Sequence, residues 1–138
     1  MADLLFVYGT LRRTARTPEA RLLADLAVHR GPASVRGRIY RIDDYPGLVL
    51  SDDPADLVAG DLFAFEDRAV LAWLDGYEGC GPEDAEPQEY RRARIAVETG
   101  DGTVEAWAYL YNWPIDGLAW IAGGDFLAAQ EPSPDPGR

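Results

Sequence analysis

Two short stretches hold the residues whose types and spacing could do chemistry. The first is YGTL at 8–11, which directly ends the apolar run LLFVY at 4–8. Gly9 frees the backbone there, Thr10 offers a hydroxyl and an exposed amide, and Leu11 completes the turn. Successive N–H groups in such a turn form a concave donor surface that suits a carboxylate or a carbonyl oxygen. The same letters also fit a plain β-turn, so both interpretations stay open.

The second stretch is LDGYEG at 74–79, in which Glu78 follows an apolar helical pattern and stands between Tyr77 and Gly79. A carboxylate beside aromatic surface loses hydration, which raises its pKa and makes it a better proton shuttle near neutral pH. The alternative is a surface acid at a helix end, because the chain contains 24 acidic residues.

Three further residues near these stretches carry reactive groups. Tyr90 begins a predicted strand soon after Glu78 and could either hydrogen-bond it or belong to the core. Tyr111 shares a strand face with other aromatic residues, which is typical of core packing, but its hydroxyl could reach a cavity. Cys80 has no histidine nearby in the sequence, so we predict no thiol nucleophile.

The elements that must position these residues follow from hydrophobic periodicity. Strands are predicted at 4–8, 33–42, 47–51, 56–65, 90–98 and 103–113. Helices are predicted at 18–29 and 66–79, with a short one near 115–122. The apolar positions expected to face the core are Leu22, Leu23 and Leu26 in the first helix and Val70, Leu71, Leu74 and Tyr77 in the second. The expected fold class is α+β, with six or seven strands that could close into a barrel and two or three helices.

Composition limits the class of protein. The 138 residues fit one domain, expected over 1–130, with a flexible C-terminal tail over 131–138. The net charge of −11 argues against a nucleic-acid partner and against an anionic membrane surface. The single cysteine allows no intrachain disulfide, and one cysteine with one histidine argues against a structural zinc cluster. With no secretion signal and no apolar stretch near the ~20 residues of a membrane helix, we expect a cytoplasmic protein.

Taken in order, FVYGTLRR, LDGYEG, YRRARIAV and GGDF form a series that resembles the gamma-glutamylcyclotransferase-like family. The resemblance is strongest to the short bacterial members and the gamma-glutamylamine cyclotransferases, and it spans residues 4 to 127. It implies a mixed β-barrel with peripheral helices and a cavity at one end. It further implies that Tyr8, Gly9, Thr10 and Leu11 hold the glutamyl part of a substrate, mainly through backbone groups, and that Glu78 is the acid/base.

The reaction implied by this resemblance is an internal displacement that needs no metal or organic cofactor. The α-amine of a γ-glutamyl group attacks its own side-chain carbonyl, 5-oxoproline closes, and the amine beyond the γ-amide leaves. One carboxylate can take the first proton and return it to the leaving nitrogen. The segment GCGPEDAEP after Glu78 is longer than in the simplest family pattern and could cover the cavity mouth. The leaving amine and the oligomeric state stay undetermined.

Two alternatives remain at this stage. The cavity could bind a small carboxylate metabolite without turnover, although a pure binder needs no proton shuttle. The same chemistry could also remove a γ-glutamyl protecting group from a biosynthetic intermediate, which differs only in the substrate.

Overall fold

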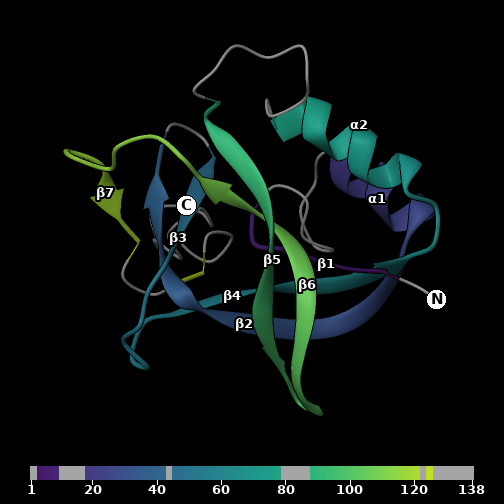
Figure 1. Cartoon of the computed structure of the whole chain (residues 1–138), viewed down its shortest axis with the longest axis horizontal. Coiled ribbons are helices and arrows are strands. Elements are labelled where there is room, and N and C mark those ends of the chain that lie inside the picture. The colour runs from purple at the N-terminus through teal and green to yellow at the C-terminus, as the bar shows by residue number, and fades with distance from the viewer. Residues whose placement is uncertain (1–2, 10–17, 43–44, 79–87, 122–123, 126–138) are drawn as a thin grey trace, which may run out of the picture.

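The computed structural model describes residues 3–9, 18–42, 45–78, 88–121 and 124–125. These residues form seven strands and two helices (Figure 1). In chain order they are β1 (Asp3–Val7), α1 (Pro18–Leu26), β2 (Val28–Arg41), β3 (Pro46–Leu50), β4 (Leu57–Phe65), α2 (Ala69–Glu78), β5 (Tyr90–Thr99), β6 (Gly102–Tyr111) and β7 (Ala119–Trp120).

Five of the strands close into a barrel in the order β2-β4-β1-β6-β5, because β5 pairs back onto β2 where Ser34 lies opposite Glu98. The pair β1–β6 is parallel and the other pairs are antiparallel, so the barrel is mixed. The remaining strands, β3 and β7, both pair with β2. The predicted α+β class with a mixed β-barrel is confirmed.

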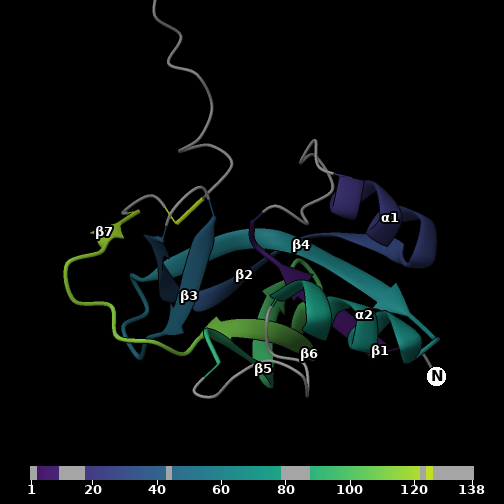
Figure 2. The ribbon, with the colours of Figure 1, turned by 90° about the horizontal axis from the view of Figure 1, so that it is seen from above.

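The apolar run at the start of the chain is continuous because both faces of β1 are buried. Phe6 and Tyr8 point into the cluster that fills the barrel, whereas Leu5 and Val7 belong to a second cluster that includes buried side chains of both helices. In Figures 1 and 2, α1 and α2 lie on one side of the barrel and β7 lies on the other. The first strand therefore ends between the barrel interior and the layer that carries α2.

The structure differs from our expectations around the first helix. α1 ends at Leu26, and β2 runs through Gly31 and Pro32, which we expected to follow the helix as a turn. A register shift between His29 and Gly31 lets β2 stay paired with β4 across this irregularity. The buried residues of α1 are Ala20 and Leu23, while Leu22 and Leu26 are 41% and 47% exposed.

Two smaller expectations are also wrong. No helix forms over the described part of 115–122; a turn, closed by the Leu118 N–H donating to the Ile115 carbonyl, leads into β7 instead. Gly117 has a φ of 81°, which an α-helix does not accommodate. In α2 the buried residues are Val70, Leu71 and Leu74, but Tyr77 is 38% exposed.

Within the ranges described, no helix is both long enough and apolar enough to span a membrane. The predicted tail at 131–138 lies outside the described residues.

Candidate active site

Tyr8 is the first residue after β1, and its side chain is buried in the barrel. The Tyr8 hydroxyl donates to the Tyr109 carbonyl at 2.5 Å and accepts from the Leu48 N–H at 3.3 Å. One phenol thus joins the end of β1 to β6 and β3. Gly9 follows as a buried residue, while Thr10 and Leu11 lie outside the described residues. The backbone cradle at 8–11 therefore stays a prediction beyond Gly9.

Glu78 is the last residue of α2 and is half-buried. Among the described residues, none is recorded as a hydrogen-bond or ion-pair partner of its carboxyl group. Loss of hydration, reinforced by the negative charge of Glu89, raises the pKa of Glu78 to about 7. Burial also raises the pKa of Tyr8, and the charge of Glu78 raises it further. The carboxyl group therefore lies within electrostatic range of Tyr8, the residue that follows β1.

The placement of Glu78 depends on how α2 is held against the barrel. Asp75 lies one helical turn before Glu78, and its Oδ1 accepts from the Tyr109 hydroxyl at 2.7 Å. The same oxygen lies 3.2 Å from Arg92 Nε. β6 and β5 thus both anchor the last turn of α2, from which Glu78 projects.

Tyr90 begins β5 and is buried. Its hydroxyl donates to the Pro46 carbonyl at 2.5 Å, so the single hydroxyl proton goes to β3 and not to Glu78. Burial is the main cause that raises the pKa of Tyr90 far above its ordinary value. The nearby charges of Tyr8 and Glu78 raise this pKa further. Tyr90 is a buried neighbour of Glu78 that ties β5 to β3.

Tyr111 ends β6 and is half-buried. Its ring lies against Gly47, where an added Cβ would come within 2.7 Å of the ring Cγ. Tyr111 also meets the Tyr90 ring edge-on, with centroids 5.5 Å apart. Burial raises the pKa of Tyr111, and the charge of Glu89 raises it further. The predicted tyrosines Tyr90 and Tyr111 therefore pack together.

Glu89 is the residue that the sequence interpretation missed. Its Oε2 accepts from the Tyr45 hydroxyl at 2.9 Å, and its carbonyl accepts from the Asn112 N–H at 2.7 Å. In the sequence it ends the acidic, proline-containing segment 79–89, whose composition is typical of an exposed loop. The signal that could have found it is its position directly before Tyr90, at the start of a strand that follows the proposed acid/base.

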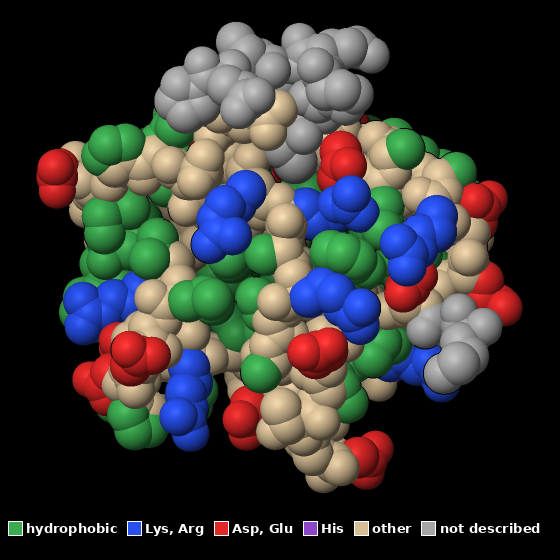
Figure 3. All heavy atoms as spheres, viewed as in Figure 1, with side chains coloured by type: hydrophobic (Ala, Val, Ile, Leu, Met, Phe, Trp, Pro, Cys, Tyr) green, Lys and Arg blue, Asp and Glu red, His purple; other side chains and the backbone are tan. Residues whose placement is uncertain are grey.

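Two arginines of β5 take part in ion pairs, Arg92 with Asp75 and Arg94 with Glu105. Arg92 and Arg94 lie over the Trp107 ring, at 4.8 and 5.4 Å from its centroid, and Arg94 also lies 3.5 Å from Glu105. Figure 3 shows arginine side chains spread over apolar surface on the face that carries β5 and β6. Arg92 offsets the acidic charge of Asp75 on α2.

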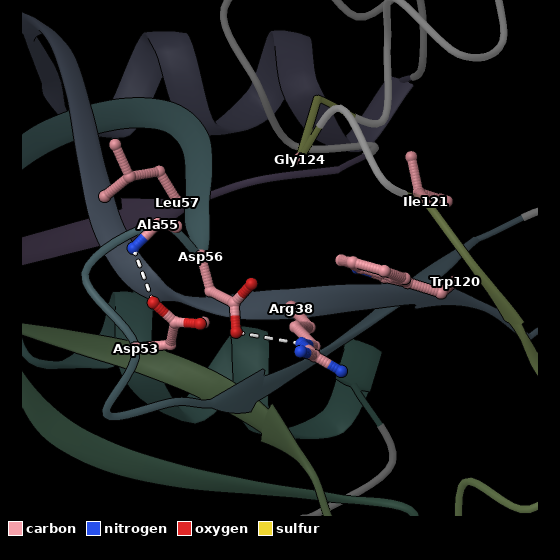
Figure 4. Close-up of a pocket in the computed structure, with 9 residues that line it drawn as sticks. Arg38, Asp53, Ala55, Asp56, Leu57, Trp120, Ile121 and Gly124 are labelled. Atoms are coloured by element: carbon pink, nitrogen blue, oxygen red, sulfur yellow. Dashed lines mark hydrogen bonds and ion pairs between the residues drawn. The ribbon is translucent and has the colours of Figure 1, made fainter.

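A separate hollow of about 320 Å³ lies where β2, β7 and the segment before β4 meet (Figure 4). Its buried carboxylate, Asp56, accepts from Ser51 Oγ at 2.7 Å and from Arg38 Nε at 2.8 Å. The Arg38 guanidinium also stacks over Trp120, at 4.4 Å from the ring centroid. These contacts fix the segment before β4 to β2, and no predicted site residue lines the hollow.

Comparison with known families identifies the relatives of this chain. A family model described as "Gamma-glutamyl cyclotransferase, AIG2-like" matches residues 5–128. The chain belongs to this family. YtfP of Escherichia coli, a gamma-glutamylcyclotransferase family protein, is 32% identical over 127 residues, which cover 89% of this chain and 95% of YtfP. The family predicted from the motif series is confirmed.

Solved structures of relatives share the gamma-glutamyl cyclotransferase fold. The solution structure of ytfP from Escherichia coli has a TM-score of 0.61 at 30% identity, covering 93% of this chain and 99% of ytfP. The crystal structure of YkqA from Bacillus subtilis has a TM-score of 0.70 at 26% identity, and the match covers 94% of this chain but only 41% of YkqA. An AIG2-like protein from Mus musculus has a TM-score of 0.64 at 23% identity, with 79% of this chain and 76% of the mouse chain covered.

Proposed function

We propose that this protein is a cofactor-independent γ-glutamyl cyclotransferase that converts a γ-glutamyl amine or related conjugate into 5-oxoproline and a free amine. The observation that carries the proposal is the Glu78 carboxyl group at the end of α2. This group is half-buried and has lost part of its hydration, no described residue bonds it, and it lies within electrostatic range of Tyr8. Membership of the family supports this class of reaction.

A carboxyl group with a pKa of about 7 can serve as base and acid in one catalytic cycle. As a carboxylate, Glu78 takes a proton from the α-ammonium group, which frees the amine to attack the γ-carbonyl. The C–N bond of the lactam forms, and the bond to the leaving nitrogen breaks. Glu78 then returns this proton to the leaving nitrogen, takes the second proton from the attacking nitrogen and passes it to the released amine, so protons balance and the carboxylate is restored.

Ring closure also requires the glutamyl chain to be folded back on itself. In this proposal the backbone N–H groups of Gly9, Thr10 and Leu11 hold the α-carboxylate or the developing oxyanion. Such positioning converts the attack into a well-oriented internal reaction, for which effective molarities reach ~10⁵ M or more. The hydrogen bonds of Tyr8 to β6 and β3 support the proposal, because they fix the residue from which this segment starts.

The test is to incubate the protein with a panel of γ-glutamyl amines and to measure 5-oxoproline. We expect product from at least one member of the panel, and we expect Glu78→Gln to lower kcat/KM by about a hundredfold or more. Glu66→Gln is the matched control, because Glu66 is exposed just before α2. Undiminished activity of Glu78→Gln would exclude the mechanism. Ligand binding by calorimetry without product over long incubation would instead indicate a binding module.

A further inference from the structure

Glu89 places a second carboxylate next to the proposed acid/base. Its negative charge contributes to the raised pKa values of Glu78, Tyr90 and Tyr111. All three groups are neutral or negative, and the described residues provide no ion-pair partner for Glu89. This part of the site therefore has an unbalanced negative potential, which favours a positively charged ligand.

The Glu89 carboxylate is held in position from two sides. The Tyr45 hydroxyl donates to its side chain at 2.9 Å. Asn112 fixes the backbone, since its N–H donates to the Glu89 carbonyl at 2.7 Å and its Nδ2 donates to the Gln88 carbonyl at 3.0 Å. A carboxylate held in this way loses little freedom when it binds a ligand.

The Glu89 carboxylate lies at one end of a series of aromatic rings that begins with Tyr45. The rings of Tyr45 and Tyr111 flank Tyr90, with centroids 6.2 and 5.5 Å from it. Trp113 continues the series at 6.5 Å from Tyr111 and is 43% exposed. Aromatic faces attract ammonium groups, and a carboxylate adds a charge-assisted hydrogen bond. We call Glu89, Tyr45, Tyr111 and Trp113 the Glu89 cluster.

We propose that the Glu89 cluster binds the leaving amine of the substrate and selects γ-glutamyl conjugates in which that amine carries a second, positively charged group. The inference rests on the proposed function, because Glu78 must protonate the leaving nitrogen close to this cluster. The second charge then lies a few bonds beyond the scissile amide. The carboxylate of Glu89 and the aromatic faces receive it, while a neutral group gains no electrostatic attraction there and an anionic group is repelled by Glu89.

The experiment compares three γ-glutamyl amides of similar length. Their amines are diaminobutane, which keeps a free ammonium group, pentylamine, which is neutral, and aminobutanoate, which is anionic. We expect the wild type to prefer the diaminobutane amide over the pentylamine amide by about tenfold or more in kcat/KM, with the anionic amide lowest. Glu89→Gln keeps the size and the acceptor for Tyr45, and we expect it to reduce this preference to about one.

The preference is a ratio within each variant, so a general effect of Glu89→Gln on Glu78 or on folding cancels. Glu105→Gln is the matched control, because Glu105 is an exposed acid on β6, and it should leave the ratio unchanged. If all three amides are cyclised and Glu89→Gln retains the wild-type ratio, the Glu89 cluster is not the amine site, while the proposed function stands.

Binding measurements separate the two proposals. Calorimetry with Glu78→Gln should show the same charge preference in Kd. With the double variant Glu78→Gln/Glu89→Gln, this preference should be lost. If no amide gives 5-oxoproline but this difference in binding is present, the proposed function fails and the cation site stands. Equal affinity of the Glu78→Gln variant for the cationic and neutral amides would overturn the cation site.

Discussion

Replacing Glu78 by glutamine should make the protein more stable at alkaline pH while it removes the proposed activity. Burial raises the pKa of this carboxyl group from its ordinary 4.5 to about 7. An acid whose pKa is raised on folding is held protonated by the folded chain. Its contribution to stability is full below about pH 4.5 and is lost as the pH rises through about 7. The increase of the Glu78 pKa on folding corresponds to a free energy of about 3 kcal/mol, at about 1.4 kcal/mol for each pKa unit.

Glutamine has no proton to lose, so the variant lacks this loss of stability. The free energy of unfolding of Glu78→Gln, relative to the wild type, should therefore increase by about 3 kcal/mol between about pH 4 and about pH 8. Urea denaturation followed by tryptophan fluorescence at a series of pH values measures it. Glu66→Gln, an exposed neighbour of α2, gives the background effect of losing one acid. A difference that stays constant across this pH range would refute the dehydration of Glu78.

Two further predictions concern the residues that shape the site. Tyr8→Phe removes a hydroxyl that bonds two buried backbone groups, and it should cost about 2 kcal/mol in urea unfolding; an unchanged midpoint would contradict this. Tyr111→Phe is its control, since no described partner is recorded for that hydroxyl. Gly47→Ala brings a methyl group within 2.7 Å of the Tyr111 ring and should destabilise by about 1–3 kcal/mol, whereas Gly76→Ala, which meets no atom within 4 Å in α2, should be neutral or stabilising.

The sequence predicts most of the barrel because burial gives each strand a recognisable pattern of apolar residues. β4 is apolar on both faces because Val58 and Leu62 point into the barrel cluster and Phe63 and Phe65 into the cluster shared with the helices. The hairpin of β5 and β6 follows from two alternating segments around TGDG. The apolar patterns of the strands do not predict that β5 pairs with β2. This pairing closes the barrel through residues that are far apart in the chain.

The errors arise where tertiary contacts override local signals. Gly31 and Pro32 normally punctuate a chain, yet here they lie in a long strand, because the pairing of β2 with β4 outweighs the turn preference. Leu22 and Leu26 fit a helical stripe, but α1 turns Ala20 and Leu23 toward the core instead. Periodicity alone does not tell which side of a short helix the barrel covers.

The site shows a different limit, because chemistry here depends on the surroundings and not on residue type. The chain has 24 acidic residues, and the order of motifs was needed to choose Glu78 among them. The structure distinguishes it by lost hydration and by the charge of Glu89, which is close in space although a segment of ten residues separates them in the sequence. Neither property can be read from the residue types near Glu78 in the sequence. For this reason the sequence did not predict a role for Glu89.

A half-buried carboxyl group that ionises near neutral pH must be held in place by contacts from neighbouring elements. A dehydrated carboxyl group with a pKa of about 7 destabilises the folded state once it ionises, so the last turn of α2 tends to move toward water. The contacts of Asp75 with Tyr109 and Arg92 oppose that movement, one helical turn before Glu78. Asp75 is thus a positioning residue in this account. The activity proposed for the chain therefore depends on a partly buried ion pair and a phenol that act one helical turn away from the acid/base.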